Sequence, residues 1–153
     1  MTMIIASSAA DILPSIDVNL TMVCHKLAHP EDGEGWPAQK LDTAVGEYLK
    51  FMALCKAYPH EVVVPCKLVD ELWHAHILDT RAYRIDCERI FGFFYDHFPY
   101  FGMRDERDAE DLRGAYDRTL ELYALNFGDP PIDTWWRVDG ARCRTQCKPV
   151  KCR

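Results

Sequence analysis

The sequence predicts an all-α fold, a compact and irregular bundle of four to five helices. Two observations lead to this prediction: apolar residues recur at three- and four-residue spacing in several segments, and alternating strand patterns are almost absent. Apolar residue types make up 48% of the 153 residues, which is enough to form a buried core. We divide the chain into a helical domain at residues 1–136 and a cysteine-containing tail at residues 137–153.

The first two predicted helices are marked by their apolar periodicity. Residues 16–27 predict a helix that ends before a proline-containing loop. Residues 37–57 predict a longer amphipathic helix, because Pro37 suits the first turn of a helix. The β-branched run at 61–64 predicts a short connector, since Pro65 holds the residue before it out of the helical region.

Two further helices and an aromatic segment complete the predicted domain. We expect a central helix at residues 70–87 and a last helix at residues 105–127. Between them, residues 91–102 hold seven aromatic side chains that are interrupted by glycine and proline. The segment is too aromatic for an exposed loop and too broken for a long helix. It predicts an irregular cap that packs on the core.

Charge is distributed unevenly between the two parts of the chain. Residues 1–136 carry 12 Lys or Arg and 23 Asp or Glu, whereas residues 137–153 carry six Lys or Arg and one Asp. An acidic surface repels phosphate backbones, so a nucleic-acid partner is not expected for the domain. The tail alone could reach an anionic partner.

Several classes of protein lack support in the sequence. No apolar run approaches the roughly 20 residues of a membrane-spanning helix, and residues 1–10 do not resemble a secretory signal. We therefore expect a soluble, cytoplasmic protein without a membrane partner. A phosphate-binding glycine loop, a dinucleotide fingerprint and a Gly-x-Ser-x-Gly motif are all missing. A protein partner and the oligomeric state are left open.

Histidines and carboxylates on the predicted central helix point to metal chemistry. Asp70 and His74 are one turn apart on one face, whereas His74 and His76 diverge by about 200° and cannot bind one ion on a regular helix. Two half-sites follow: one joins Asp70 with His74. The other joins His76 with Asp79, Tyr83 and either Asp86 or Cys87.

Each half-site needs a ligand from another segment, and His97 and His60 are the candidates by residue type. Imidazole and carboxylate ligands suit zinc or iron, and three such ligands with an open position are typical of a catalytic site. The candidate metal ligands are Asp70, His74, His76 and His97. The competing interpretation is that these side chains form ordinary hydrogen bonds in a core.

A longer pattern surrounds these residues between positions 40 and 102. It consists of Asp70-x-x-Trp73-His74-x-His76-x-Leu78 and Tyr83-x-x-Asp86-Cys87, with Tyr48-x-x-Phe51, Pro65 and Phe91-Gly92. The pattern resembles the glycine-rich domain-containing protein family. The resemblance implies a shared domain without a settled enzymatic activity. Longer eukaryotic members, linked to development and stress and suggested to contact RNA, carry glycine-rich extensions, whereas this tail has few glycines.

The tail forms a second candidate site. Cys143, Cys147 and Cys152 lie within ten positions among basic residues, which favour the thiolate form. Three thiolates could bind a soft metal or form a disulfide, with a fourth ligand from Cys24, His25 or a second subunit. The alternative is a flexible terminus whose thiols stay reduced.

These features support three hypotheses about function. The leading one is a small metal-binding helical protein, a metal-dependent enzyme or a component of one, in which an open metal position acts as a Lewis acid or activates water. The second is a non-catalytic interaction module in which the Trp-His-x-His helix is architectural. The third is redox chemistry or soft-metal binding through the tail cysteines.

Overall fold

The computed structural model describes residues 7–136, and within this range the chain forms six α-helices, one short 3-10 helix and no strand. The prediction of an all-α fold is therefore confirmed. In chain order the elements are α1 (Ala9–Ile12), η1 (Leu13–Ser15), α2 (Thr21–Ala28), α3 (Ala38–Ala57), α4 (Lys67–Leu78), α5 (Thr80–Phe91) and α6 (Glu106–Phe127).

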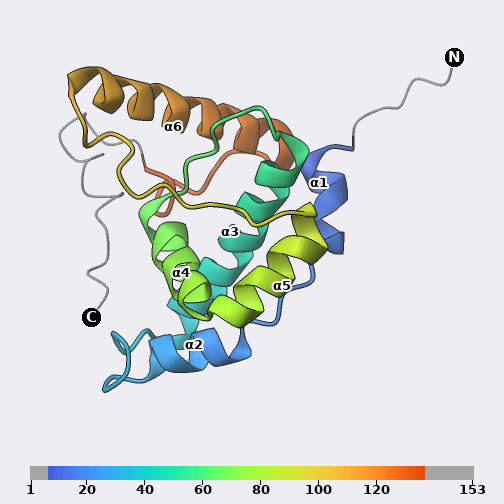
Figure 1. Ribbon diagram of the computed structural model, residues 1–153, viewed down its shortest axis with the longest axis vertical. Coiled ribbons are helices and arrows are strands. Elements are labelled where there is room, and N and C mark those ends of the chain that lie inside the picture. Colours follow the sequence, from blue (N-terminus) through green and yellow to red (C-terminus); the bar gives the residue numbers. More distant parts are fainter. Residues whose placement is uncertain (1–6, 137–153) are drawn as a thin grey trace, which may run out of the picture.

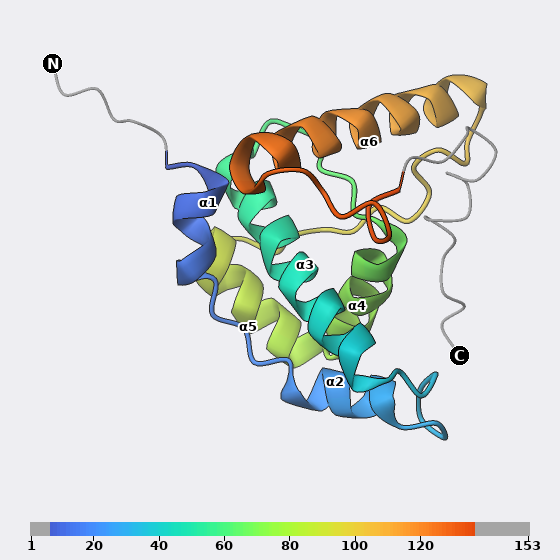
Figure 2. The ribbon, with the colours of Figure 1, turned by 180° about the vertical axis from the view of Figure 1, so that it is seen from behind.

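Helix α3 runs through the middle of the molecule and contacts α1, α2 and α4 (Figures 1 and 2). Helix α6 crosses one end of it, and α2 crosses the opposite end. In its second half, at residues 51–55, α3 is buried on all sides, as expected for an apolar helix in the interior of the molecule. Its buried apolar residues are Ala44, Tyr48, Phe51, Met52, Ala53, Leu54 and Cys55.

The long helices begin and end close to the positions that the sequence predicts. Pro37 is the N-cap of α3 in an extended conformation, and Asp105 caps α6 by accepting a hydrogen bond from the Asp108 amide at 2.8 Å. The connector at 61–64 is irregular, as expected. The helix predicted at residues 16–27 corresponds to α2 and begins only at Thr21, since residues 16–20 are not helical.

The predicted continuous helix at residues 70–87 is wrong: the chain breaks at Asp79 into α4 and α5. Asp79 has backbone angles of φ −80° and ψ 70°, and its carboxylate accepts a hydrogen bond from the Ala82 amide at 3.4 Å. Aspartate at a cap competes with the helix backbone in this way. After the break α5 runs at an angle to α4 (Figures 1 and 2), and each helix buries one face.

The aromatic segment between α5 and α6 is irregular, as predicted, but it covers the core only in part. Phe91, Tyr95 and Phe101 pack against the core, whereas four other aromatic side chains are about half exposed. These four are Phe93, Phe94, Phe98 and Tyr100.

None of the helices between residues 7 and 136 combines the length and the apolar character of a membrane span. The cysteines of this range are free, and three of them (Cys55, Cys66 and Cys87) are buried. Burial raises the pKa of the Cys55 and Cys66 thiols to about 12. These two cysteines therefore act as small apolar core residues.

Candidate metal centre

Asp70, His74 and His97 meet at one point on the surface of the core. Asp70 and His74 lie one turn apart on α4, as the spacing predicts, and His97 arrives from the irregular segment after α5. The Nε2 atom of His97 is 2.8 Å from Asp70 Oδ1 and 2.8 Å from His74 Nε2. The remaining pair, Asp70 Oδ1 and His74 Nε2, is 3.5 Å apart. One ligand atom from each residue could bind the same metal ion.

Hydrogen bonds alone satisfy this arrangement poorly. If the Nε2–H of His97 donates to Asp70, the lone pair of His74 faces the same nitrogen. If instead His74 donates to His97, the lone pairs of His97 and Asp70 face each other. His97 Nε2 can form only one of these two hydrogen bonds at a time, because it carries either one hydrogen or one lone pair. At least one of its two 2.8 Å contacts is therefore not a hydrogen bond. A cation between the three atoms would be attracted to all of them.

The distances are close to those that a small ion requires. A tetrahedral ion with bonds of about 2.0–2.1 Å separates its ligands by about 3.3 Å. The Asp70 to His74 distance already fits at 3.5 Å. The two contacts of His97 would have to lengthen by about 0.5 Å to reach this separation.

Burial and charge favour the ligand forms of these side chains. The side chains of Asp70, His97 and His74 are 4%, 10% and 16% exposed, so the group is sheltered but reachable from solvent. Burial lowers the pKa of His74, against the opposing attraction of the Asp70 carboxylate. A neutral imidazole keeps the lone pair that metal binding requires.

The second ring nitrogen of His74 has no hydrogen-bond partner in the part of the chain that the structure describes. His74 Nδ1 is buried, and nothing in the described range from 7 to 136 forms a hydrogen bond with it. An unsatisfied buried polar group costs about 1–3 kcal/mol. A metal bond at Nε2 would leave Nδ1 as an unpaired N–H donor, so this atom does not itself favour a metal ion.

His76 lies in a different environment, where both of its ring nitrogens have partners. Its Nδ1 is 2.7 Å from the Tyr48 hydroxyl, and its Nε2 is 2.9 Å from Asp86 Oδ2. Asp86 also accepts a hydrogen bond from Arg89 at 2.7 Å. His76 is fully buried. The structure therefore separates His76 from the other three candidate ligands. Of the predicted second half-site, Asp86 is hydrogen-bonded to His76, and Tyr83 meets it only through an edge-on ring contact.

The remaining residues of that half-site have other roles. Asp79 caps α5, and the Tyr83 hydroxyl contacts Trp73 and the carbonyl of Tyr95. His60, the other candidate by residue type, is exposed and outside the group. The tail cysteines Cys143, Cys147 and Cys152 lie outside the described residues.

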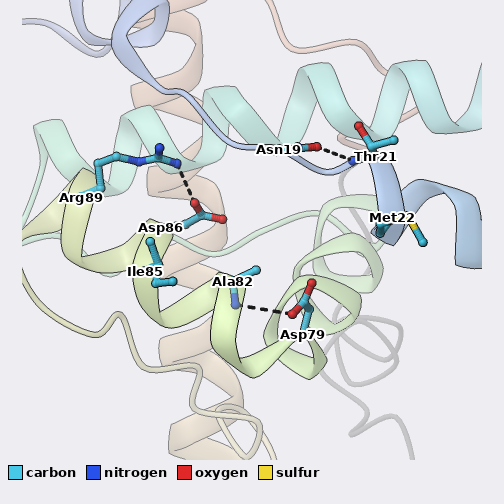
Figure 3. Close-up of a pocket in the computed structure, with 8 residues that line it drawn as sticks. All are labelled: Asn19, Thr21, Met22, Asp79, Ala82, Ile85, Asp86 and Arg89. Carbon is cyan, nitrogen blue, oxygen red and sulfur yellow. Dashed lines mark hydrogen bonds and ion pairs between the residues drawn. The ribbon is translucent and has the colours of Figure 1, made fainter.

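A pocket of about 510 Å³ opens beside Asp86, away from the three ligands (Figure 3). It lies between the start of α2 and the exposed side of α5, and the Arg89 to Asp86 ion pair lies along its wall. Asp86 is 6% exposed, and both of its oxygens have partners. The carboxylate in this pocket is therefore already satisfied.

Two features of the polar interior were not identified from the sequence. Glu47 on α3 is buried and accepts hydrogen bonds from the Tyr123 hydroxyl at 2.8 Å and from Trp135 Nε1 at 2.7 Å. Glu47 lies three residues after Ala44 on the apolar face of α3, and this position in the sequence could have indicated that it is buried. The other feature is the set of aromatic contacts around His97, which join segments far apart in the chain.

Comparisons with known proteins identify one family. The profile of the UCP032817-like family matches residues 32–126, which is more than half of the chain and includes all three candidate ligands. No curated protein and no solved structure gives a significant match. The expected membership of the glycine-rich domain-containing protein family is wrong, because the family that matches is a different one. The motif behind that resemblance includes Trp73 and His76, which are buried in this core and reflect packing.

Proposed function

We propose that this chain, which belongs to the UCP032817-like family, binds a transition-metal ion through Asp70, His74 and His97. The observation that carries the proposal is the triangle of three ligand atoms, all within 3.5 Å of one another, at a sheltered point reachable from solvent. Two imidazoles and one carboxylate suit zinc or ferrous iron.

Three protein ligands leave at least one position of the metal open. Such a position, in sites of this composition, holds water or a substrate atom, and the metal lowers the pKa of that water. This supports a role as a metal-dependent enzyme or as a component of one. The exposure of His74, at 16% of its side chain, gives a small molecule access to the group.

Metal analysis of protein purified without an affinity tag tests the proposal. We expect one zinc or iron ion per chain in the wild type after anaerobic purification. His74→Ala and His97→Ala should each lose most of this metal while the helical circular dichroism signal is kept, because both side chains lie at the edge of the core. His60→Ala is the matched control, since His60 is exposed and outside the group.

Zinc should also stabilise the wild type. A ligand at about 100 times its Kd adds about 2.7 kcal/mol to the free energy of unfolding. A wild type that holds no stoichiometric metal, and whose thermal unfolding does not respond to zinc or ferrous iron, would contradict the proposal.

The second candidate function is a non-catalytic interaction module. The observation that favours it is the exposed aromatic surface of Phe93, Phe94, Phe98 and Tyr100, next to His97 in the chain. In this case His74→Ala should lower the melting temperature with no metal to lose. The same set of variants therefore separates the two functions.

A further inference from the structure

The segment that carries His97 needs support from other parts of the molecule. Residues 93–98 form neither helix nor strand, so no regular backbone ladder fixes them. The position of the His97 ring therefore depends on tertiary contacts. A metal ligand that is held loosely binds its ion weakly, because binding must then order the segment as well.

A chain of aromatic contacts supplies this support. Trp73 lies on α4 directly before His74, and its ring packs against the His97 ring with centroids 4.2 Å apart. The Trp73 indole N–H donates a hydrogen bond of 3.0 Å to the Tyr83 hydroxyl. That hydroxyl donates in turn to the backbone carbonyl of Tyr95, at 2.5 Å.

The Tyr83 hydroxyl is therefore the link between the two restraints on His97. It orients the indole that covers the imidazole ring, and it holds the backbone two residues before His97. Tyr83 is 1% exposed, so water does not compete for these bonds. Its ring also packs edge-on against His76 and Phe94, and these contacts do not need the hydroxyl.

We propose that Tyr83 is a positioning residue of the metal centre: through Trp73 and the Tyr95 carbonyl, its hydroxyl fixes His97 for metal binding and so sets the affinity of the site. This inference rests on the proposed function. It adds α5 to a site whose ligands come from α4 and from the irregular segment after α5. Groups that orient metal ligands in this way commonly contribute 10- to 100-fold to metal affinity.

The test is Tyr83→Phe, which keeps the ring and removes only the hydroxyl. We expect the Kd for Zn²⁺, measured by competition with a chromophoric chelator, to rise about 10- to 100-fold. The visible absorption of the Co²⁺-loaded protein should change as well, because the geometry at His97 relaxes. Unchanged zinc affinity and an unchanged Co²⁺ spectrum would overturn the inference.

Tyr123→Phe is the matched control. Tyr123 is also 1% exposed, and its hydroxyl also makes two hydrogen bonds, to Glu47 and Lys50. This variant should lose stability and keep its zinc Kd within about twofold. An equal loss of affinity in both variants would show that general destabilisation is the cause, and would also overturn the inference.

A double-mutant cycle identifies the residue through which Tyr83 acts. If the hydroxyl works through His97, Tyr83→Phe should not further weaken the residual Zn²⁺ binding of a His97→Ala variant, titrated at higher Zn²⁺ concentration than the wild type. The same loss in both backgrounds would exclude His97 as the mediator. If Tyr83→Phe does not fold, Trp73→Phe tests the aromatic support as a whole, because it removes both the N–H donor to Tyr83 and the indole packed on His97. Unchanged zinc affinity in that variant would also overturn the inference.

The outcomes also separate this inference from the proposed function. A wild type that binds neither Zn²⁺ nor Co²⁺ overturns the proposed metal site and this inference with it. A wild type that binds both ions, with a Tyr83→Phe variant that binds them equally well, overturns only the role of Tyr83.

Discussion

His74 and His76 are two residues apart in one helix, and their environments give them opposite roles. The His74 side chain is 16% exposed and faces another imidazole and a carboxylate. The His76 side chain is 1% exposed, with one nitrogen at a hydroxyl and the other at a carboxylate. The first environment suits the proposed metal ligand, because the group has too few hydrogens for its close contacts. The second environment is that of a core residue whose hydrogen bonds are satisfied.

This contrast predicts a specific effect of His76→Ala. The substitution removes a buried ring and leaves the Tyr48 hydroxyl and one Asp86 oxygen without their partner. We expect a loss of about 2–4 kcal/mol in the free energy of unfolding, measured by urea denaturation, with zinc stoichiometry unchanged. His74→Ala should instead lose its zinc, and the metal-free protein should keep most of its free energy of unfolding. A His76→Ala protein that folds stably but has lost its metal would contradict the assignment.

For the individual residues of the site, helical geometry made the main features predictable. The four-residue spacing of Asp70 and His74 placed them together, and the two-residue spacing kept His76 apart. His97 was a candidate by residue type alone. Its aromatic supports could not be predicted, because Trp73, Tyr83 and Tyr95 meet only when three separate segments pack together.

The break between α4 and α5 shows where prediction of the elements failed. Apolar and polar residues continue through Asp79 without an obvious stop, so periodicity favours one long helix. The buried pairing of His76 with Asp86, ten residues later, needs the turn. A tertiary contact therefore decides a local conformation that helix propensity leaves open.

The segment between α5 and α6 depends on a glycine whose role local patterns do not reveal. Gly102 has φ of 85°, and a Cβ atom there would lie 2.4 Å from Cδ2 of the buried Leu112. Gly92 has a similar φ of 78°, but open space surrounds its Cβ position. Comparing Gly102 with Gly92 therefore separates two costs of adding a Cβ atom: that of the left-handed backbone conformation and that of a steric clash.

We predict that Gly102→Ala is more destabilising than Gly92→Ala. Both variants should lose about 1–2 kcal/mol because the left-handed conformation disfavours a Cβ atom. Gly102→Ala should lose about 1–3 kcal/mol more, because Leu112 must move to make room for the new methyl group. Urea denaturation measures both values. Equal losses would show that Leu112 adapts without cost.

Across the whole molecule, buried polar groups join segments that the apolar core only brings near. Glu47 links α3 to Tyr123 on α6 and to Trp135 near the end of the described range. Asp86 links α5 to His76 on α4. Such groups fix one arrangement among several that would bury the same apolar area. The sequence predicts the helices from their apolar faces, but it does not predict how these polar contacts orient them.

Asp108 forms the corresponding link between α6 and the segment that carries His97. Its carboxylate accepts hydrogen bonds from the Gly102 amide at 2.7 Å and the Arg104 amide at 3.2 Å, and it pairs with the Arg104 guanidinium. The hydrogen bond from Arg104 is the main reason that the pKa of Asp108 falls from 3.8 to about 2. The charged form is therefore favoured in the folded protein.

This shift predicts how the molecule responds to acid. Because the pKa is lower in the folded state, the unfolded chain binds a proton first as the pH falls. The stabilisation by Asp108 is complete above about pH 4 and is lost between about pH 4 and pH 2. Asp108→Asn should lower the free energy of unfolding at pH 6 and should show a smaller decrease over that acid range. The measurement is urea denaturation at each pH, with Asp111→Asn, an exposed aspartate on the same helix, as the control. If Asp108→Asn lost stability with acid as steeply as the wild type, this carboxylate would not be the group that ties the segment to α6.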